Sequence, residues 1–406
     1  MLQALVLSIG LAAAAAGDVP PPAPSPLPTT PPVPGLGARI RALPVAARKD
    51  VPLEDGGVAI DAVYAEGAAA RAGLAVGDVF LSLDGEPVPA PRALGDALGR
   101  RRAGDSVRFE VWRGGKRVEA KATLGPALEE LTHSCEKHDA AGCAGLAELY
   151  LRGAGVERDG FRAARLFTES CDAGDAPSCT TVAFMQLRMV SKPVHPGPAV
   201  ALYTRGCDGG DPRGCALLGQ AFEVGLAMMP DREKAVALYR KACDGGAGEG
   251  CSGLAGLHLK GEGALKDAKA AVELYRTGCA LWDGQGCFSL GSLEGDAADS
   301  LRAFRRGCDS GHPQACLRTA EMMQAGRGAE TDAAGAAAIL QRVCEQWGFL
   351  PACLPLANAY AEGRGVTPDR TKAAEFFQRF CDMGDAQACA SAQRLRPSPL
   401  LPPTIK

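Results

Sequence analysis

The sequence is short of the residues from which most catalytic and nucleic-acid sites are built. The formal net charge of -3 argues against a nucleic-acid binder, because neutralising many phosphates needs a clustered excess of Lys and Arg. After residue 16 no apolar run is long enough to cross a bilayer. Histidine occurs only 5 times in 406 residues, too scattered for a metal-ligand set or a catalytic triad, at His133, His138, His195, His258 and His312. We therefore expect no metal, no cofactor, no membrane span in the mature chain and no nucleic-acid partner.

The abundant features indicate an exported protein with more than one domain. Apolar residues make up 47% of the chain and charged residues 22%, which is enough for sizeable cores. At about 150 residues per domain, the length suggests two or three units. Residues 1–16 read as a signal peptide with cleavage after Ala16, which predicts a periplasmic or secreted protein. The proline-dense residues 17–35 predict an extended linker, and residues 396–406 predict a disordered tail.

Residues 36–126 show short β-patterned runs separated by Gly and Asp. Residues 57–63 and 106–112 alternate apolar and polar side chains, as half-buried strands do. Between strands, Asp84-Gly85 and Gly114-Gly115 supply turn chemistry. A helix is expected over residues 91–102, with Leu94 and Leu98 on one face. The fold class predicted here is a small α+β domain.

From residue 127 to 395 the chain carries a ladder of cysteines. Members of a pair are eight positions apart, or nine in one pair, and the first members recur with a period of 36 from Cys135 to Cys279 before steps of 29, 36 and 37. Such a period predicts an all-α solenoid of helical hairpins, each burying its apolar face against its neighbours. The pairs are Cys135 with Cys143, Cys171 with Cys179, Cys207 with Cys215, Cys243 with Cys251, Cys279 with Cys287, Cys308 with Cys316, Cys344 with Cys353, and Cys381 with Cys389.

The cysteines of a pair have two candidate uses, a disulfide or a metal. On one continuous helix, residues eight apart would lie about 12 Å from each other, beyond the roughly 7 Å limit for a disulfide. Turn-forming residues lie between them, as in residues 172–175, so the chain reverses direction and a disulfide can close. Metal binding is disfavoured because C-x-x-C spacing is absent, His is scarce and export disfavours free thiols.

The first domain resembles the PDZ domains of HtrA-type proteases. The resemblance is carried by residues 69–85, by the helix with Leu94 and Leu98, and by residues 111–116. It implies a groove in which an extended C-terminal peptide adds a strand, its carboxylate held by backbone N–H groups of the loop at residues 35–38. Ala38 is smaller than the bulky residue usual in that loop. The expected peptide-binding residues are Leu36, Gly37, Ala38, Ile40, Leu94 and Leu98.

The solenoid resembles SEL-one-like repeats, relatives of the tetratricopeptide repeat, and especially the cysteine-rich Hcp proteins. Residues 360–366 and 372–377 carry the resemblance, which implies one disulfide per repeat. The unit of residues 287–315 is seven residues short, and residues 192–198 replace the usual Gly-x-Gly loop of another unit. Either departure could bend the superhelix.

The Hcp resemblance also raises an enzymatic alternative, β-lactam binding or weak hydrolysis. Residues 134–137 read Ser-Cys-Glu-Lys and match the Ser-x-x-Lys motif of serine β-lactamases, but no Ser-Asp-Asn or Lys-Thr-Gly follows. The expected function is therefore a non-enzymatic adaptor or scaffold, with a groove for C-terminal peptides and a concave repeat surface for other proteins. A regulator of an envelope protease is a further alternative.

Overall fold

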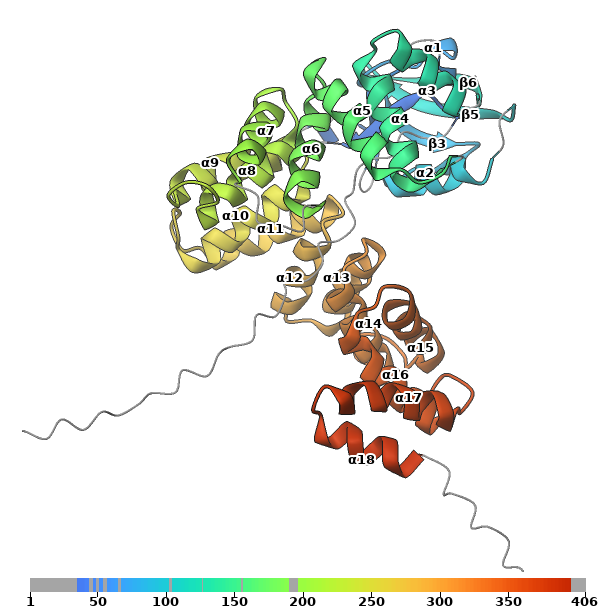
Figure 1. Ribbon diagram of the computed structural model, residues 1–406, viewed down its shortest axis with the longest axis vertical. Helices are drawn as coiled ribbons and strands as arrows, with labels where there is room; N and C mark the ends of the chain where they lie inside the picture. Colours follow the sequence, from blue (N-terminus) through green and yellow to red (C-terminus); the bar gives the residue numbers. More distant parts are fainter. Residues whose placement is uncertain are drawn as a thin grey trace, which may run out of the picture.

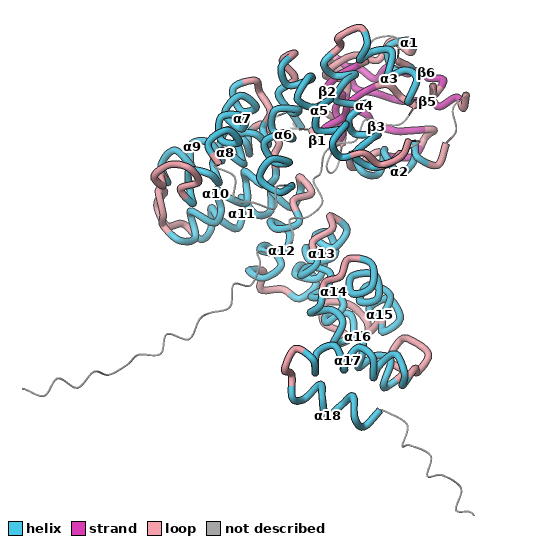
Figure 2. The backbone as a smooth tube through the Cα atoms, viewed as in Figure 1, coloured by secondary structure: helices cyan, strands magenta, loops and turns pink. Residues whose placement is uncertain are grey.

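The computed structural model describes residues 35–395, except 44–46, 49–50, 54–56, 65–66, 102–103, 126, 155 and 190–195. The signal peptide, the linker except its last residue, and the tail expected from the sequence lie outside the described residues. So does most of the segment 192–198. An antiparallel sheet domain comes first, and a long stack of helices follows (Figures 1 and 2).

The sheet has the strand order β1-β2-β3-β5-β6, with β4 paired to β3, and every pairing is antiparallel. Burial alternates along β5, which accounts for its apolar-polar sequence pattern. Among the described strands, β1 and β6 are the edges of the sheet. The strand bounds are β1 Ala38–Ala42, β2 Val58–Val63, β3 Val79–Leu83, β4 Glu86–Pro87, β5 Ser106–Arg113 and β6 Lys116–Thr123.

Two short helices, α1 (Ala68–Arg71) and α2 (Pro91–Gly99), complete the domain. One buried apolar cluster draws residues from all the strands except β4 and includes Phe80 and Phe109, whose ring centroids lie 5.1 Å apart. The helix α2 ends at Gly99, before the expected end at residue 102, because glycine is a poor helix former and the chain continues in a turn in which Arg101 N donates to Leu98 O.

The helical part consists of hairpins stacked along the chain, each packing on its neighbours in sequence (Figure 1). The stack changes direction at α12 and α13, the short unit that the sequence singled out (Figure 2). The helix bounds are α3 Ala127–Glu136, α4 Ala140–Arg152, α5 Gly160–Asp172, α6 Ala176–Met189, α7 Gly197–Asp208, α8 Pro212–Val224, α9 Arg232–Asp244, α10 Gly248–Lys260, α11 Ala268–Ala280, α12 Gly284–Leu293, α13 Ala297–Asp309, α14 Pro313–Ala325, α15 Ala333–Gln341, the π-helical turn η2 Arg342–Gln346, α16 Leu350–Glu362, α17 Arg370–Asp382 and α18 Ala386–Leu395.

The two glycines of a Gly-x-Gly loop are required for different structural reasons. Gly261 ends α10 in the left-handed conformation, which glycine adopts without steric cost. Gly263 also has a positive φ, and a Cβ there would lie 2.6 Å from the carbonyl oxygen of Arg232 on the preceding hairpin. The second glycine therefore lets consecutive hairpins approach closely at this loop.

All sixteen cysteines form disulfides, with Cα–Cα distances of 4.3 to 5.0 Å, so no thiol is left to bind a metal. Each disulfide joins two helices across a short turn. The pair with nine-residue spacing accommodates its additional residue where η2 widens the end of α15. Every expected pair is confirmed: Cys135 with Cys143, Cys171 with Cys179, Cys207 with Cys215, Cys243 with Cys251, Cys279 with Cys287, Cys308 with Cys316, Cys344 with Cys353, and Cys381 with Cys389.

Candidate functional site: the β1 groove and its junction with the solenoid

The loop that begins β1 is held by backbone contacts with residues 64–69. Tyr64 N donates to Gly37 O at 2.9 Å, and Ala69 N donates to Leu36 O at 2.6 Å. Gly37 has φ +67°, and a Cβ there would lie 2.7 Å from Gly67 Cα. Only glycine fits this position, because both the backbone conformation and the close approach exclude a side chain.

Strand β1 follows this loop directly and forms one edge of the sheet. It pairs with β2 on one side and, among the described strands, has no strand partner on the other. The helix α2 lies beside β1. An unpaired edge strand presents backbone N–H and C=O groups to which an extended peptide can add.

The structure places the apolar residues expected to bind peptide in the core of the sheet domain. Their side chains have at most 1% exposure and belong to a single cluster. The partly exposed surface of α2 beside this cluster includes Ala97. The side chains expected to line a peptide pocket are therefore part of the core of the domain itself. The residues in the cluster are Leu36, Ala38, Ile40, Leu94 and Leu98.

The segment from Gly73 to Asp78, part of the motif that carries the PDZ resemblance, owes its shape to a buried carboxylate. Asp78 accepts from Ala75 N at 2.9 Å and from Arg113 Nε at 2.6 Å. Arg113 Nη2 also donates to Gly73 O at 2.8 Å. The hydrogen bond to Asp78 raises the pKa of Arg113. This network is structural and lies within the sheet domain.

Strand β1 also forms the main polar contact between the sheet domain and the solenoid. Arg39 Nε lies 2.8 Å from Asp61 Oδ2 on β2, and Arg39 Nη1 lies 2.7 Å from Asp175 Oδ1 at the turn before α6. The side chains of Arg39 and Asp175 are only 15% and 6% exposed. Burial lowers the pKa of Arg39, but attraction to Asp175 and Asp61 outweighs it and raises the pKa above its usual value.

Two apolar contacts extend this junction. Tyr64, just after β2, packs in a cluster with Leu131 of α3 and Ala147 of α4, where burial raises its pKa. At the other end, Ala42 packs against Leu281 and the disulfide-bonded Cys243 and Cys251. No sequence pattern predicted these contacts. The available signal was Arg39, a charged residue between buried residues of a strand, which indicates that this strand contacts another part of the chain.

The Ser-x-x-Lys motif does not form an exposed nucleophile. Ser134 lies within α3 with 1% exposure, and its hydroxyl donates to Asp139 Oδ2 at 2.5 Å. Asp139 is the N-cap of α4. The hydroxyl thus stabilises the turn of the first hairpin and is inaccessible to a substrate.

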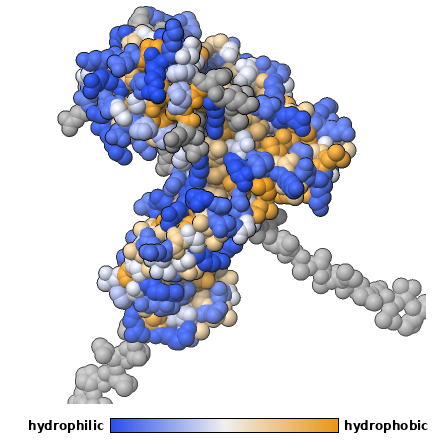
Figure 3. Space-filling model, turned by 180° about the vertical axis from the view of Figure 1, so that it is seen from behind, coloured by the Kyte–Doolittle hydropathy of each residue, from blue (hydrophilic) through white to orange (hydrophobic). Residues whose placement is uncertain are grey.

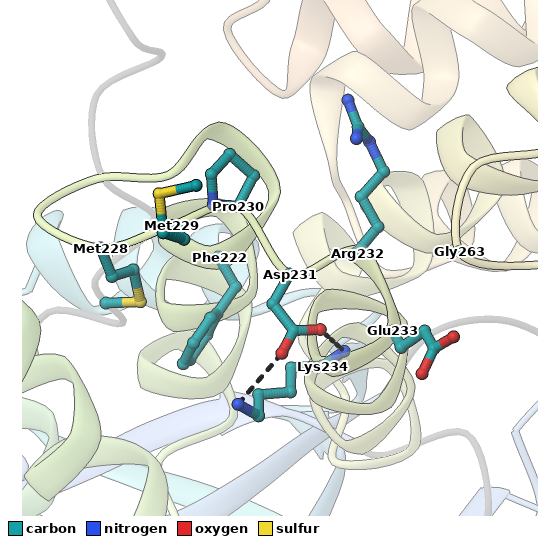
Figure 4. A pocket seen from close by; sticks show the side chains of 9 residues that line it. All are labelled: Phe222, Met228, Met229, Pro230, Asp231, Arg232, Glu233, Lys234 and Gly263. Carbon is teal, nitrogen blue, oxygen red and sulfur yellow. Dashed lines mark hydrogen bonds and ion pairs between the residues drawn. The ribbon is translucent and has the colours of Figure 1, made fainter.

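A shallow cavity of about 570 Å³ lies on the solenoid, at the loop between α8 and α9 (Figure 4). Lys234 lies over the ring of Phe222 at 5.4 Å and pairs with Asp231 at 3.0 Å. Corresponding residues 138 positions later, including Tyr360 and Lys372, form a smaller cavity between α16 and α17. Because it recurs, we read this arrangement as part of the repeat. Elsewhere the solenoid surface mixes apolar and polar side chains (Figure 3).

Among the described residues, no three or more His, Cys, Asp or Glu side chains are grouped so that they could hold a metal ion. No helix among them has the length and apolar character needed to cross a membrane.

Comparison with known families accounts for both parts of the chain. A PDZ domain family matches residues 36–124, and the Sel1 repeat family matches residues 140–175, 212–246, 248–281 and 350–385. The chain carries a PDZ domain followed by Sel1 repeats. A PDZ domain and a helical-repeat solenoid are both architectures suited to binding other proteins.

Individual relatives match parts of the chain. A probable periplasmic serine endoprotease DegP-like from Pseudomonas fluorescens is 39% identical over 74 residues, 18% of this chain and 16% of the relative. The chain therefore spans less than a fifth of that protease. The solved structure of a protective antigen of uropathogenic Escherichia coli with an SLR fold is 24% identical, with TM-score 0.48. The match covers 68% of this chain and 64% of the antigen chain. The solved structure of Helicobacter pylori cysteine rich protein B is 24% identical, with TM-score 0.27. The match covers 34% of this chain and 99% of the Helicobacter chain.

The eight disulfides of the Sel1 repeats point to an exported protein, because such a ladder persists in oxidising compartments.

Proposed function

We propose that this protein is an exported adaptor that binds the free C-termini of other proteins along β1, and presents them beside the Sel1 solenoid. The observation that supports this is the glycine loop at Gly37, which is followed directly by β1, next to α2; β1 has an edge that no described strand pairs with. The N–H groups of such a loop suit a carboxylate, and the strand edge suits the extended chain before it. Regulation of an envelope protease is the special case in which the captured C-terminus belongs to that protease.

A screen of free-acid C-terminal peptides against the purified protein tests this proposal. Fluorescence anisotropy should show micromolar binding that is lost when the terminal carboxylate is amidated. Replacing Ala97→Glu, beside the apolar cluster on α2, should abolish binding, whereas Ala75→Glu at an exposed position of the same domain should not. Far-UV circular dichroism checks that both variants fold. If no free-acid peptide binds, or if amidation has no effect, the proposal is wrong.

β-Lactam hydrolysis is not proposed as a second function, because the Ser134 hydroxyl is buried and hydrogen-bonded to Asp139. Nitrocefin turnover that is lost on Ser134→Ala would reverse this choice.

A further inference from the structure

If the proposed function holds, a peptide bonds to the backbone groups on the open edge of β1. The backbone groups of Gly37 and Leu43, just outside the two ends of β1, bond to Tyr64 and Gly57 at the two ends of β2. Because bonding direction alternates along an antiparallel strand, the backbone groups of the even-numbered residues of β1 face the open edge. They can accept a peptide only while β1 keeps its extended conformation.

The pairing of β1 with β2 is interrupted at the centre of the strand. β1 has five residues, and the register shifts between Arg39 and Ile40, where Asp61 of β2 has no opposite residue. A bulge of this kind disrupts the ladder locally. A short strand that is paired on one side and interrupted at its middle opens at a low cost in free energy. The sheet alone therefore holds β1 weakly.

The solenoid contacts β1 at this bulge. Arg39 Nε lies 2.8 Å from Asp61 Oδ2, and Arg39 Nη1 lies 2.7 Å from Asp175 Oδ1. Alternation along the strand puts the Arg39 side chain on the face opposite Ala38 and Ile40, whose side chains belong to the PDZ core. The ion pair therefore supports β1 from the face that is turned away from the core.

Asp175 is itself held firmly within the solenoid. It lies in the turn that the disulfide between Cys171 and Cys179 closes. Its Oδ2 accepts from Ser178 N at 3.0 Å and from Ser178 Oγ at 2.6 Å, while Oδ1 binds Arg39. A carboxylate whose own partners are fixed can hold the side chain that it binds in one position.

We infer, on the basis of the proposed function, that Asp175 of the solenoid is a positioning residue for peptide binding by the PDZ domain. Through Arg39 it keeps the bulged centre of β1 in the conformation that accepts a peptide. Apparent affinity falls with the fraction of molecules in which β1 is competent to bind. By thermodynamic linkage, a peptide bound to β1 in turn stabilises the contact between Arg39 and Asp175. The first Sel1 repeats thus belong to the peptide-binding unit.

The peptide affinity of Asp175→Asn tests this role. Asparagine keeps an oxygen that can accept from Ser178 N and removes the charge that faces Arg39. With the tightest free-acid peptide from the screen, fluorescence anisotropy should show about tenfold weaker binding, which corresponds to a competent β1 in roughly a tenth of the molecules.

Asp211→Asn is the matched control. Asp211 occupies the same place one repeat later, is buried to the same degree and caps α8. Its side chain bonds to Thr180 and to backbone N–H groups of the solenoid. The affinity of Asp211→Asn should therefore equal that of the native protein.

Hydrogen exchange separates positioning from a general loss of stability. In peptide-free Asp175→Asn, the β1 amides that bond to β2 should exchange faster than in the native protein, while the amides of β3 keep their protection. Asp211→Asn should leave both sets unchanged. Equal affinity of Asp175→Asn and the native protein, or an equal loss in the two variants, overturns the positioning role and leaves the proposed function intact. If no free-acid peptide binds the native protein, both are wrong.

Discussion

The PDZ domain and the Sel1 solenoid hold their chains together in different ways. The PDZ core consists of a main cluster built from residues between Leu36 and Leu124 and a small one around Leu43, Ala59 and Val79, with no cysteine. The solenoid core is divided into several clusters, such as the one around Tyr203 and the one around Tyr275, and a disulfide closes every hairpin. The small clusters bury too little apolar surface to stabilise a hairpin alone, whereas one larger cluster runs from Leu301 to Ala392. Covalent closure and contact with the next hairpin supply the difference.

Reduction of the disulfides should give the largest difference in stability between the PDZ domain and the solenoid. Each disulfide closes a loop of about nine residues and contributes on the order of 2 to 3 kcal/mol in the chain-entropy model. With dithiothreitol, hydrogen exchange should show loss of protection throughout the solenoid helices, while amides of β3 and β5 stay protected. Simultaneous loss of protection in sheet and helices would show that the PDZ core does not stay folded without the disulfides.

Disrupting the close contact between hairpins should have the next largest effect on the free energy of unfolding. Gly263→Ala places a Cβ 2.6 Å from the Arg232 carbonyl oxygen, in addition to straining a positive φ. We expect a loss of about 2 to 4 kcal/mol in the free energy of unfolding. The control Gly174→Ala has a positive φ but open space around its Cβ, so it should lose only about 1 kcal/mol. Urea unfolding of both variants measures the difference, and equal losses would rule out the contact as the cause.

The junction between the two parts should depend on Arg39 more than on Arg71. Arg39→Ala leaves the buried Asp175 without its cation, whereas Asp61 keeps its ion pair with Arg41. The loss should cost about 1 to 3 kcal/mol and split the calorimetric transition in two. Arg71 pairs with Glu130 of α3, but its side chain is 53% exposed, so Arg71→Ala should cost less than about 1 kcal/mol. A single unshifted transition for Arg39→Ala would show that the apolar contacts of Tyr64 and Ala42 suffice.

Two N-cap residues of the solenoid should give opposite, smaller dependences on pH. Burial, then repulsion from Glu249, raises the pKa of Asp283 to about 6, so its contribution to stability falls as pH rises from about 4 to 6. Burial lowers the pKa of His312 to about 4, so its contribution rises between about pH 4 and 6.5.

Asparagine can cap both helices without titrating. Between pH 4 and 6, Asp283→Asn should make stability rise more steeply with pH than in the native protein, and His312→Asn should make it rise less. Melting temperatures across this range measure the slopes. Parallel profiles for the two variants would show that neither group titrates as expected.

Much of the fold could be predicted from local patterns. Alternation identified β2 and β5, and the eight-residue spacing around turn formers identified the disulfide pairs. The candidate site was less accessible. Spacing indicated Leu94 and Leu98 as one face of a helix, but it did not show that this face is filled by the core. Nor did it show that the turn residue Asp175 contacts β1.

The sequence by itself determined the two families, the hairpin period and the disulfide ladder, because each depends on residues within one repeat or one domain. Only the tertiary structure decided where β1 lies against the solenoid. That contact joins Arg39 and Asp175, 136 residues apart, and depends on the accumulated rotation of stacked hairpins. No local spacing encodes it, since each partner alone is an ordinary surface charge of its own element.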